Sequence, residues 1–328
     1  MKKNKYRSID LFAGIGGIRL GFDKAFGKEI ETVFISEWDK FAVQTYSANF
    51  RDNFAIEGDI TKIDETQLKP FNMICGGSPC QDFSIAGNQA GSKWKCKDCD
   101  HEYNPLTVHY SKRFQCPNCG SENLDKTRSS LLVEWLRIIR TNKPKWGIYE
   151  NVKNIVGKKF QNTFDMFTNE LHEYGYNTYY KILNAKDYGI PQNRERVYLI
   201  IILKELDNGQ FKFPEPFDNG LRLKDVLEDK VDEKYYINTK KAQELIDDLI
   251  DSGKLSKDIS NTVRTGGERK YRPTSMGCGS NLIKTGIFSK QCKQFDKEID
   301  VANTLLARDY KGFGNQGMNG VIECKKTK

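Results

Sequence analysis

Cys80 is the residue whose type and surroundings most clearly suggest chemistry. It lies in GGSPCQDFS (76–84), between Pro79 and Gln81, directly after the apolar run MIC and a glycine pair. A cysteine thiolate is a strong nucleophile, and it forms where the local potential is positive. The polar neighbours predict a loop at the end of a buried strand. The alternative is a small buried cysteine, which is the usual setting of a free thiol.

Charged residues are expected to lie beside this cysteine. Glu150 follows the apolar pair IY in GIYENV, at the expected end of the strand next to the one before Cys80. A carboxylate at the end of a buried strand is either ion-paired or functional. Arg194 and Arg196 are two residues apart in the extended segment QNRER, so their side chains should point to the same side. They would supply positive potential, and a solvated charge cluster is the alternative.

A glycine-rich turn, FAGIGG, lies between the first expected strand and the first expected helix. Gly14, Gly16 and Gly17 would let the backbone approach a ligand closely, and the start of the helix offers free N–H groups. The turn lacks the six-residue dinucleotide fingerprint, and no GK[ST] phosphate motif follows it. On its own, the turn is therefore also compatible with a purely structural role.

Acidic residues after the next two expected strands favour an adenosyl ligand without phosphates. Glu37 is placed to accept from both ribose hydroxyls, and Trp38 would cover one face of the ligand. Asp59, in GDI, would accept from an adenine amino group. Because no basic phosphate clamp accompanies these carboxylates, the pattern suits S-adenosylmethionine, which carries a positive sulfonium.

Two CxxC pairs, CKDC and CPNC, are separated by 16 residues. This spacing is a strong signal for a tetrahedral zinc site, and four reduced structural cysteines are the alternative. His101 and His109 are weaker candidates because four thiolates already complete the ligand set. The predicted ligands are Cys96, Cys99, Cys116 and Cys119.

Strands and helices alternate over the first two hundred residues, which predicts an α/β fold with a mostly parallel, doubly wound sheet. Ligands bind such sheets outside the carboxyl ends of the strands, so the turn, the cysteine and the charged residues should share one edge. After residue 205 the chain is richer in glycine, asparagine and threonine, which predicts a smaller, irregular, partly β domain with a helix over 240–253. The expected strands are 8–14, 32–39, 55–60, 72–77, 145–152, 178–185 and 196–203, and the expected helices are 17–27, 41–50, 129–143 and 160–175.

The composition fits these expectations without specifying them. The chain has 328 residues, 38% hydrophobic and 29% charged, and its net charge of +8 favours a nucleic-acid partner only weakly. No apolar run approaches the roughly 20 residues of a membrane helix, and no secretory core is visible. We therefore expect a cytoplasmic protein, in which nine cysteines favour metal binding or catalysis over disulfides.

The motifs DLFAGIGG, EW, GDI, GGSPCQDFS, ENV and QNRERV occur in the order and spacing of the cytosine-5 DNA methyltransferases, which the chain resembles over residues 8 to about 203. The resemblance implies a Rossmann-like, S-adenosylmethionine-dependent methyltransferase fold. It also implies that Cys80 attacks C6 of a flipped-out cytosine in double-stranded DNA, that Glu150 contacts N3, and that C5 takes the methyl group.

The resemblance assigns further residues and leaves alternatives open. Arg196 would help to hold the ring, while Arg194 and Gln81 would lie by the DNA backbone or the base. Methylation of cytosine in RNA, by a related tRNA-methylating branch, is an alternative, and so is a non-catalytic DNA-binding remnant. The cofactor site implied by the family consists of Phe12, Gly14, Gly16, Gly17, Glu37, Trp38, Asp59, Ile60 and Pro79.

Two features depart from the usual family pattern. The zinc segment, 93–126, lies inside the catalytic domain (1–204), where a short loop over the bound base is usual, and its basic residues are expected to contact DNA phosphates. The target-recognition region (205–328) is not followed by the family's closing motifs. This predicts either a split enzyme, in which a complementing C-terminal segment or second subunit supplies the end, or a truncated reading frame, with an excised fragment as the alternative. The basic residues are Lys93, Lys95, Lys97, Lys112 and Arg113.

Overall fold

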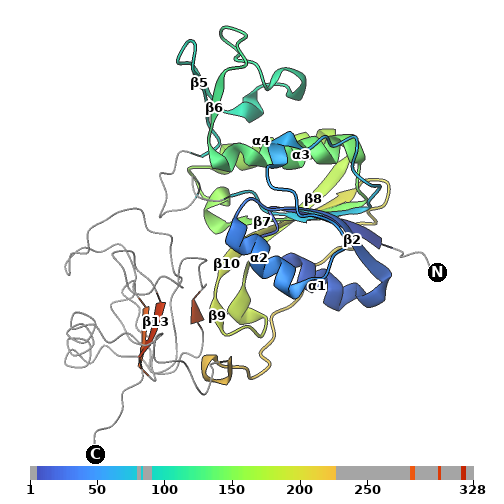
Figure 1. Ribbon diagram of the computed structural model, residues 1–328, viewed down its shortest axis with the longest axis vertical. Helices are drawn as coiled ribbons and strands as arrows, with labels where there is room; N and C mark the ends of the chain where they lie inside the picture. Colours follow the sequence, from blue (N-terminus) through green and yellow to red (C-terminus); the bar gives the residue numbers. More distant parts are fainter. Residues whose placement is uncertain are drawn as a thin grey trace, which may run out of the picture. The chain divides into compact units, whose positions relative to one another are not determined.

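Figure 1 shows the computed structural model of the chain, which describes residues 6–79, 83, 91–226, 281–284, 302–303 and 319–322. The chain divides into two compact units. The first comprises Met1–Ile182 and Arg196–Phe213, and the second comprises Leu183–Glu195 and Pro214–Lys328. The domain boundaries expected at 1–204 and 205–328 stay a prediction.

A six-stranded sheet forms the centre of the first unit, in the order β2-β1-β3-β7-β10-β8. Strand β1 pairs in parallel with β2 and β3, and β3 pairs in parallel with β7, whereas β7 and β10 are antiparallel. This mostly parallel sheet confirms the expected Rossmann-like fold. The strands are β1 (Tyr6–Leu11), β2 (Ile30–Ser36), β3 (Met73–Gly76), β7 (Trp146–Val152), β8 (Tyr176–Asn184) and β10 (Glu195–Leu203).

Helices cover both faces of this sheet, as Figure 1 shows: α1 (Gly17–Phe26) and α2 (Lys40–Asn49) lie on one face, and α3 (Leu132–Asn142) and α4 (Gln161–Glu173) on the other. Local chemistry sets their ends. Helix α1 begins after Gly16 and ends at Gly27, and both glycines have positive φ angles. The carboxylate of Asp39 caps α2 by accepting from the N–H groups of Phe41 and Ala42.

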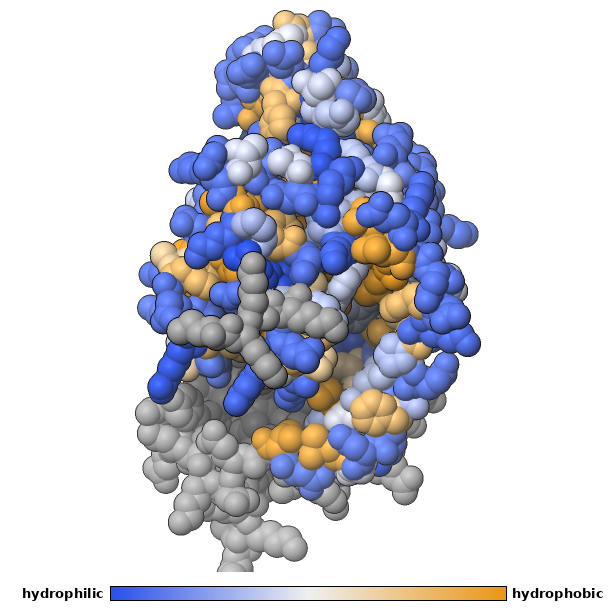
Figure 2. All heavy atoms as spheres, turned by 90° about the vertical axis from the view of Figure 1, so that its right-hand side faces the viewer, coloured by the Kyte–Doolittle hydropathy of each residue, from blue (hydrophilic) through white to orange (hydrophobic). Residues whose placement is uncertain are grey.

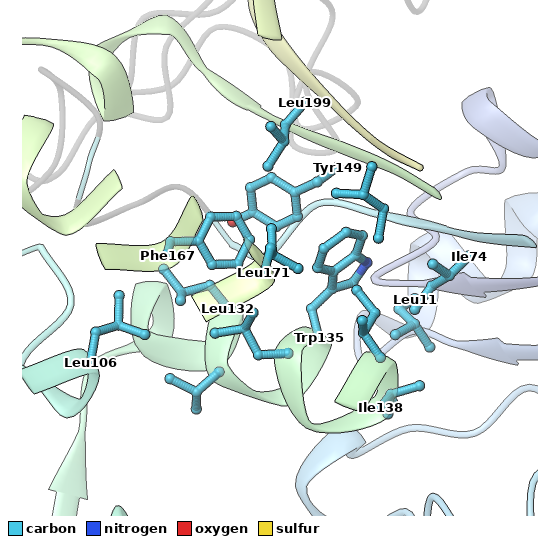
Figure 3. Packing of buried hydrophobic residues seen from close by; sticks show 14 of the residues in the cluster. Leu11, Ile74, Leu106, Leu132, Trp135, Ile138, Tyr149, Phe167, Leu171 and Leu199 are labelled. Atoms are coloured by element: carbon cyan, nitrogen blue, oxygen red, sulfur yellow. The ribbon is translucent and has the colours of Figure 1, made fainter. Parts of the chain in front are cut away.

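The larger hydrophobic core lies between the sheet and helices α3 and α4. Trp135 of α3 packs against Tyr149 of β7 and Phe167 of α4, with ring centroids 5.3 and 6.0 Å away (Figure 3). These three aromatic side chains are fully buried, and each aromatic pair adds to the stabilisation from burial. A smaller core on the other face packs Phe22 of α1 against Met73 and Cys75 of β3.

The prediction of a strand over 55–60 is wrong. In the structure, a single bridge joins Ser36 to Glu57, and the short 3₁₀ helix η2 (Ile60–Lys62) follows. The carboxylate of Asp59 accepts from the N–H group of Thr61, and this capping turn ends any extended run. The other expected strands and helices of the first unit are confirmed, with ends shifted by a few residues.

The segment 93–126, called here the cysteine module, forms a three-stranded sheet of its own in the order β5-β4-β6. Its side chains continue the main core: Trp94, Tyr103 and Leu106 belong to the same buried cluster as Trp135, and Leu106 appears in Figure 3. The elements are β4 (Trp94–Cys96), β5 (Glu102–Tyr103), η3 (Pro105–Thr107), η4 (Tyr110–Lys112) and β6 (Leu124–Lys126), and η5 (Arg128–Leu131) then leads into α3.

A buried ion pair attaches the cysteine module to α4. Arg113 donates from Nη1 to Oε1 of Glu170 over 3.1 Å and from Nε to the carbonyl of Pro105 over 2.9 Å. Arg113 is 4% exposed and Glu170 is 8% exposed. The expected contact of Arg113 with DNA phosphates is therefore wrong, because its guanidinium is already held inside the fold. Lys93 and Lys95 pair at the surface with Glu102 and Asp100, and Lys97 and Lys112 are exposed.

In the second unit the described elements are short. Strand β11 (Asn281–Lys284) pairs in parallel with β13 (Asn319–Ile322), and β9 (Gln192–Asn193) pairs with β12 (Ala302–Asn303). The helix expected over 240–253 lies outside the described residues. In the part of the chain that the structure describes, the remaining 3₁₀ helices are η1 (Gly27–Glu29), η6 (Lys153–Val156), η7 (Ala185–Asp187) and η8 (Leu223–Val226).

Hydrophilic residues cover most of the face shown in Figure 2, and hydrophobic residues form smaller patches on it. Within the described ranges, no helix combines the length and the hydropathy that crossing a membrane would require.

Candidate active site

The carboxyl ends of β1 and β3 meet at Gly76, which is in register with Leu11 of β1 on one side and with Tyr149, near the carboxyl end of β7, on the other. The glycine pair of GGSPC is required here for space. A Cβ on Gly76 would lie 2.2 Å from the carbonyl oxygen of Leu11, and a Cβ on Gly77 would lie 2.2 Å from that of Glu150. The chain leading to Cys80 therefore passes directly against the end of β7.

Glu150 is held at this edge by an ion pair. Its Oε1 lies 3.0 Å from Nε of Arg196, which is near the start of β10, the antiparallel neighbour of β7. The two side chains are 23% and 16% exposed, so the pair is neither fully buried nor freely solvated. Sequence reasoning placed both residues at this site, and the structure brings them together.

A buried polar network behind this edge includes residues that sequence reasoning missed. The hydroxyls of Ser78 and Tyr149 lie 2.6 Å apart, and Nδ2 of Asn151 donates to the carbonyl of Ser78 over 3.1 Å. Ser78 and Asn151 are within the motifs GGSPCQDFS and ENV. The available signal was a polar side chain at the carboxyl end of each of two buried strands, where a buried polar group requires a hydrogen-bond partner.

The carbonyl of Pro79 also has a buried partner. It accepts from Oγ of Ser129 over 3.0 Å, and Ser129 is fully buried in η5. Pro79 was expected only in the cofactor site. The sequence around Ser129 indicated the start of a helix. It gave no sign that the Ser129 hydroxyl would bind the carbonyl of Pro79, 50 residues earlier.

The glycine-rich turn, which was expected to let the backbone approach a ligand closely, connects β1 to α1. Phe12, Gly14 and Gly16 have positive φ angles of 55°, 56° and 87°. A Cβ on Gly16 would lie 2.2 Å from the ring of Phe50, so this position also lacks space for a side chain. Gly17, the last glycine of the turn, begins α1.

Glu37 shapes this turn from the end of β2. Its Oε2 accepts from the N–H of Gly14 over 2.7 Å, and its Oε1 accepts from the N–H of Asp39 over 2.8 Å. A carboxylate has about four acceptor sites, so capacity remains for ligand hydroxyls. The neighbouring Trp38 is 76% exposed, and its ring is available to a ligand face.

Asp59 and Ile60, two further residues of the expected cofactor site, lie at the start of η2. Burial raises the pKa of Asp59, but hydrogen bonds from Thr61 and the charge of Lys62 outweigh it, so the pKa is below its ordinary value. Asp59 is therefore ionised near neutral pH, and both of its carboxylate oxygens are acceptors. Ile60 is buried and belongs to the main core.

A buried carboxyl, that of Asp10, lies in β1 shortly before the turn. Sγ of Cys75 donates to Oδ1 of Asp10 over 3.3 Å, while Oδ2 of Asp10 has no hydrogen-bond partner among the described residues. Burial raises the pKa of Asp10 to about 7, although the bond from Cys75 and the charge of Arg19 act in the opposite direction. Burial and the nearby Asp10 also raise the pKa of the Cys75 thiol well above its usual value.

The four module cysteines form one cluster. All four sulfur atoms lie within 4.8 Å of one another, with 3.5 Å between Cys96 and Cys119 and 3.6 Å between Cys99 and Cys116. A tetrahedral site with Zn–S bonds of about 2.3 Å has sulfur atoms about 3.8 Å apart, so the donor set and its spacing fit zinc. Hydrogen bonds from Asn118 and from the N–H of His101 lower the pKa of Cys99 to about 6.

Three expected site residues are not placed beside this edge. Cys80 and Gln81 lie outside the described residues. Arg194 belongs to the second unit, between β9 and β10, where its N–H donates to Oδ1 of Asn184 over 2.9 Å. Their expected roles remain predictions.

The chain matches the model of a protein family described as "C-5 cytosine-specific DNA methylase" over residues 6–111 and 118–314. The type II methyltransferase M.SsoII of Shigella sonnei is 39% identical over 239 residues, which cover 72% of this chain and 54% of that protein. The type II methyltransferase M.HhaI of Haemophilus parahaemolyticus is 32% identical over 291 residues, covering 87% of this chain and 76% of that protein.

Solved structures share the fold at low sequence identity. The Entamoeba histolytica methyltransferase EhMeth matches with a TM-score of 0.53 and 21% identity, covering 79% of this chain and 68% of that one. A Spodoptera frugiperda DNMT2 mutant matches with a TM-score of 0.52 and 20% identity, covering 78% and 67%. The chain spans about half the length of the first curated relatives it matches, 54% and 53% of the two proteins.

Proposed function

The chain belongs to the C-5 cytosine-specific DNA methylase family, and on this premise we propose that it transfers a methyl group from S-adenosylmethionine to C5 of cytosine in DNA. The observation that carries the proposal is the Glu150–Arg196 ion pair. It lies at the strand edge that also holds Gly77, three residues before Cys80. This arrangement supplies a fixed carboxylate, that of Glu150, next to the segment that leads to the proposed nucleophile Cys80.

In the proposed reaction the Cys80 thiolate adds to C6 of an everted cytosine, forming a C–S bond and making C5 electron-rich. Glu150 contacts N3 and stabilises its protonated form, and Arg196 holds the carboxylate and the ring. S-adenosylmethionine, when bound, supplies an electrophilic methyl group to C5. The C5 proton then leaves to a base, its electron pair restores the C5–C6 double bond, and the C6–S bond breaks to return the thiolate.

The glycine-rich turn and the acidic and aromatic residues expected beside it suit S-adenosylmethionine. Glu37 orients the turn through Gly14 and keeps acceptor capacity for the ribose, Trp38 offers an exposed ring, and Asp59 is an ionised acceptor. The turn also provides close backbone approach at the start of α1. Phe12, Gly16, Gly17, Ile60 and Pro79 complete the proposed cofactor site.

Covalent trapping tests the proposal. Duplex DNA with 5-fluorocytosine in place of cytosine should form an adduct at Cys80 that depends on S-adenosylmethionine, because the C5 fluorine blocks release of the sulfur. Cys80→Ser should form none, whereas the matched variant Cys75→Ser, which alters a buried thiol of β3, should still be trapped. A Cys80→Ser enzyme that methylates DNA at the wild-type rate would contradict the mechanism.

Two further arms separate the alternatives. Trapping by tRNA in preference to duplex DNA would favour an RNA substrate, and cofactor-independent DNA binding without any adduct would favour a remnant. Because the chain spans about half the length of the first curated relatives, trapping is measured with the chain alone and with the C-terminal part of M.SsoII added. An increase on addition would support the proposed complementing segment.

The cysteine module is proposed to bind one structural Zn²⁺. The support is the four-sulfur cluster, whose spacing matches a tetrahedral thiolate site. Elemental analysis of the purified chain should give one zinc per chain. Cys119→Ser, which removes an exposed ligand, should lower zinc content, whereas Ser111→Ala in the same module should not. Full zinc occupancy in Cys119→Ser would argue against the site.

A further inference from the structure

The two carbonyl groups immediately before Cys80 are each held by a buried side chain. Nδ2 of Asn151 donates to the carbonyl of Ser78, and Oγ of Ser129 donates to the carbonyl of Pro79. The two donors come from opposite directions along the chain. Asn151 belongs to β7 at the end of the sheet, whereas Ser129 lies three residues beyond the cysteine module.

The position of Ser129 depends on hydrogen bonds that join the two ends of the cysteine module. Thr127 forms three hydrogen bonds there: its N–H donates to the carbonyl of Lys93, its Oγ1 donates to the carbonyl of Gly91, and its Oγ1 accepts from the N–H of Lys93. Their lengths are 3.0 to 3.1 Å. The two ends of the module are therefore fastened together directly before Ser129.

The same segment is tied to the strand that carries a cysteine of the cluster. Nε1 of the buried Trp94 donates to Oγ of Ser130 over 2.6 Å, and Ser130 in turn donates to the carbonyl of Thr127. Trp94 and Cys96 both lie on β4, which pairs with β6 so that Cys96 faces Leu124. A continuous set of backbone and side-chain contacts thus runs from the cysteine cluster to Ser129.

We propose that Ser129 is a positioning residue for the methyl transfer and that the cysteine module sets its place. The inference rests on the proposed role of Cys80 as nucleophile. The carbonyl of Pro79 belongs to the peptide group that joins Pro79 to Cys80, and a peptide group is planar. Fixing that oxygen therefore fixes the direction in which the chain continues to Cys80. The module acts on the reaction through this hydrogen bond, at a distance from the substrate.

The test compares Ser129→Ala with Ser129→Thr, which keeps the hydroxyl, and with Ser111→Ala. Ser111 belongs to the cysteine module, and its hydroxyl lies 2.7 Å from Nδ1 of His109. In single-turnover methyl transfer, Ser129→Ala should be slower by about 10- to 100-fold, as expected for a misplaced reacting group. Zinc content should stay at one per chain. Ser129→Thr should recover most of the rate.

A second readout uses neither DNA nor cofactor. The alkylation rate of Cys80 by iodoacetamide, resolved by peptide mass spectrometry, should move in Ser129→Ala toward the rate of an unstructured peptide of the same sequence. Trp94→Phe removes the donor to Ser130 but keeps an aromatic ring. It should slow methyl transfer in the wild type and add little in Ser129→Ala, because both changes act through one contact path.

Several results would overturn the inference. They are an unchanged transfer rate and alkylation rate in Ser129→Ala, a rate in Ser129→Thr or in Ser111→Ala that is as low as in Ser129→Ala, or fully additive effects of Trp94→Phe and Ser129→Ala. These outcomes are distinct from failure of the proposed function. If Cys80→Ser keeps full methyl transfer, the nucleophile assignment itself is wrong. If Cys80 is required but Ser129→Ala behaves as wild type, only the positioning role is wrong.

Discussion

Nε of Arg196 lies 3.0 Å from Oε1 of Glu150, across the antiparallel pair formed by β10 and β7. In the strand register Arg196 is opposite Val152, so it reaches diagonally to the residue two positions earlier. This places both ends of the ion pair on rigid strands. The carboxylate of Glu150 is consequently held near the carboxyl end of β7 by a residue of the neighbouring strand β10.

Removal of Arg196 should therefore misplace Glu150. Arg196→Ala is expected to reduce the single-turnover rate of methyl transfer by about 100-fold, since small displacements of reacting groups cost rates of that order. The measurement is rapid-quench methyl transfer at saturating DNA. Arg7→Ala is the matched control, because Arg7 makes a 3.7 Å pair with Glu31 at the start of β1, away from the carboxyl edge. Equal rates in both variants would contradict the assignment.

Gly77 should not tolerate a side chain. A Cβ there would lie 2.2 Å from the backbone carbonyl of Glu150, so β7 must shift. Gly77→Ala is expected to destabilise the fold by about 1–3 kcal/mol and to abolish most adduct formation. Gly21→Ala is the control, because that position in α1 has open space and should gain up to about 1 kcal/mol. Urea denaturation and trapping measure both effects, and an active, stable Gly77→Ala would refute this close approach.

Arg113 and its neighbour Lys112 should behave in opposite ways. Arg113→Ala leaves Glu170 buried without its partner, which typically costs about 3–5 kcal/mol of unfolding free energy. Lys112 is exposed, so Lys112→Ala should change stability by no more than about 0.5 kcal/mol.

The two changes should also differ in DNA binding. If Lys112 contacts a phosphate, as we propose for the exposed lysines of the module, its loss should reduce the salt slope of DNA affinity by about one. Arg113→Ala, in folded protein at low temperature, should keep the wild-type slope. A reduced slope in Arg113→Ala alone would show that the buried pair opens when DNA binds.

Asp10 should make stability depend on pH. Its pKa in the fold is about 7, above the ordinary value of an aspartate, so its contribution is full below pH about 4 and is lost as the pH rises through 7. The unfolding free energy of the wild type, relative to Asp10→Asn, should fall across this window by at most about 1.4 kcal/mol per pH unit.

The control is Asp64→Asn, because hydrogen bonds from Thr66 lower the pKa of that exposed carboxyl. Its contribution is present above the unfolded pKa and is lost only as the pH falls below about 4. The difference between wild type and Asp64→Asn should therefore be constant from pH 5 to 8. A difference between wild type and Asp10→Asn that is equally flat would show that Asp10 is not protonated in the fold.

Local patterns were enough for most of the fold. The alternation of apolar runs with helical periodicity indicated the parallel sheet, and the glycines of FAGIGG indicated a turn between the first strand and the first helix. The exception is instructive. AIEGDI has the composition of a short strand, but the side chain of Asp59 caps a turn and the segment keeps one bridge to Ser36. Competition between a local hydrogen bond and strand pairing cannot be resolved from residue types alone.

The sequence by itself identified the candidate site residues and the order in which they occur: the glycine turn, the carboxylates after the strands, Glu150, Arg196, and the four cysteines of the two CxxC pairs. Only the tertiary structure decided that Arg113 is buried against Glu170 rather than exposed, and that Ser129 holds the carbonyl of Pro79. The physical reason is range. Spacing and propensity act over a few residues, whereas these contacts join positions 57 and 50 residues apart and exist only once the helices and the cysteine module have packed.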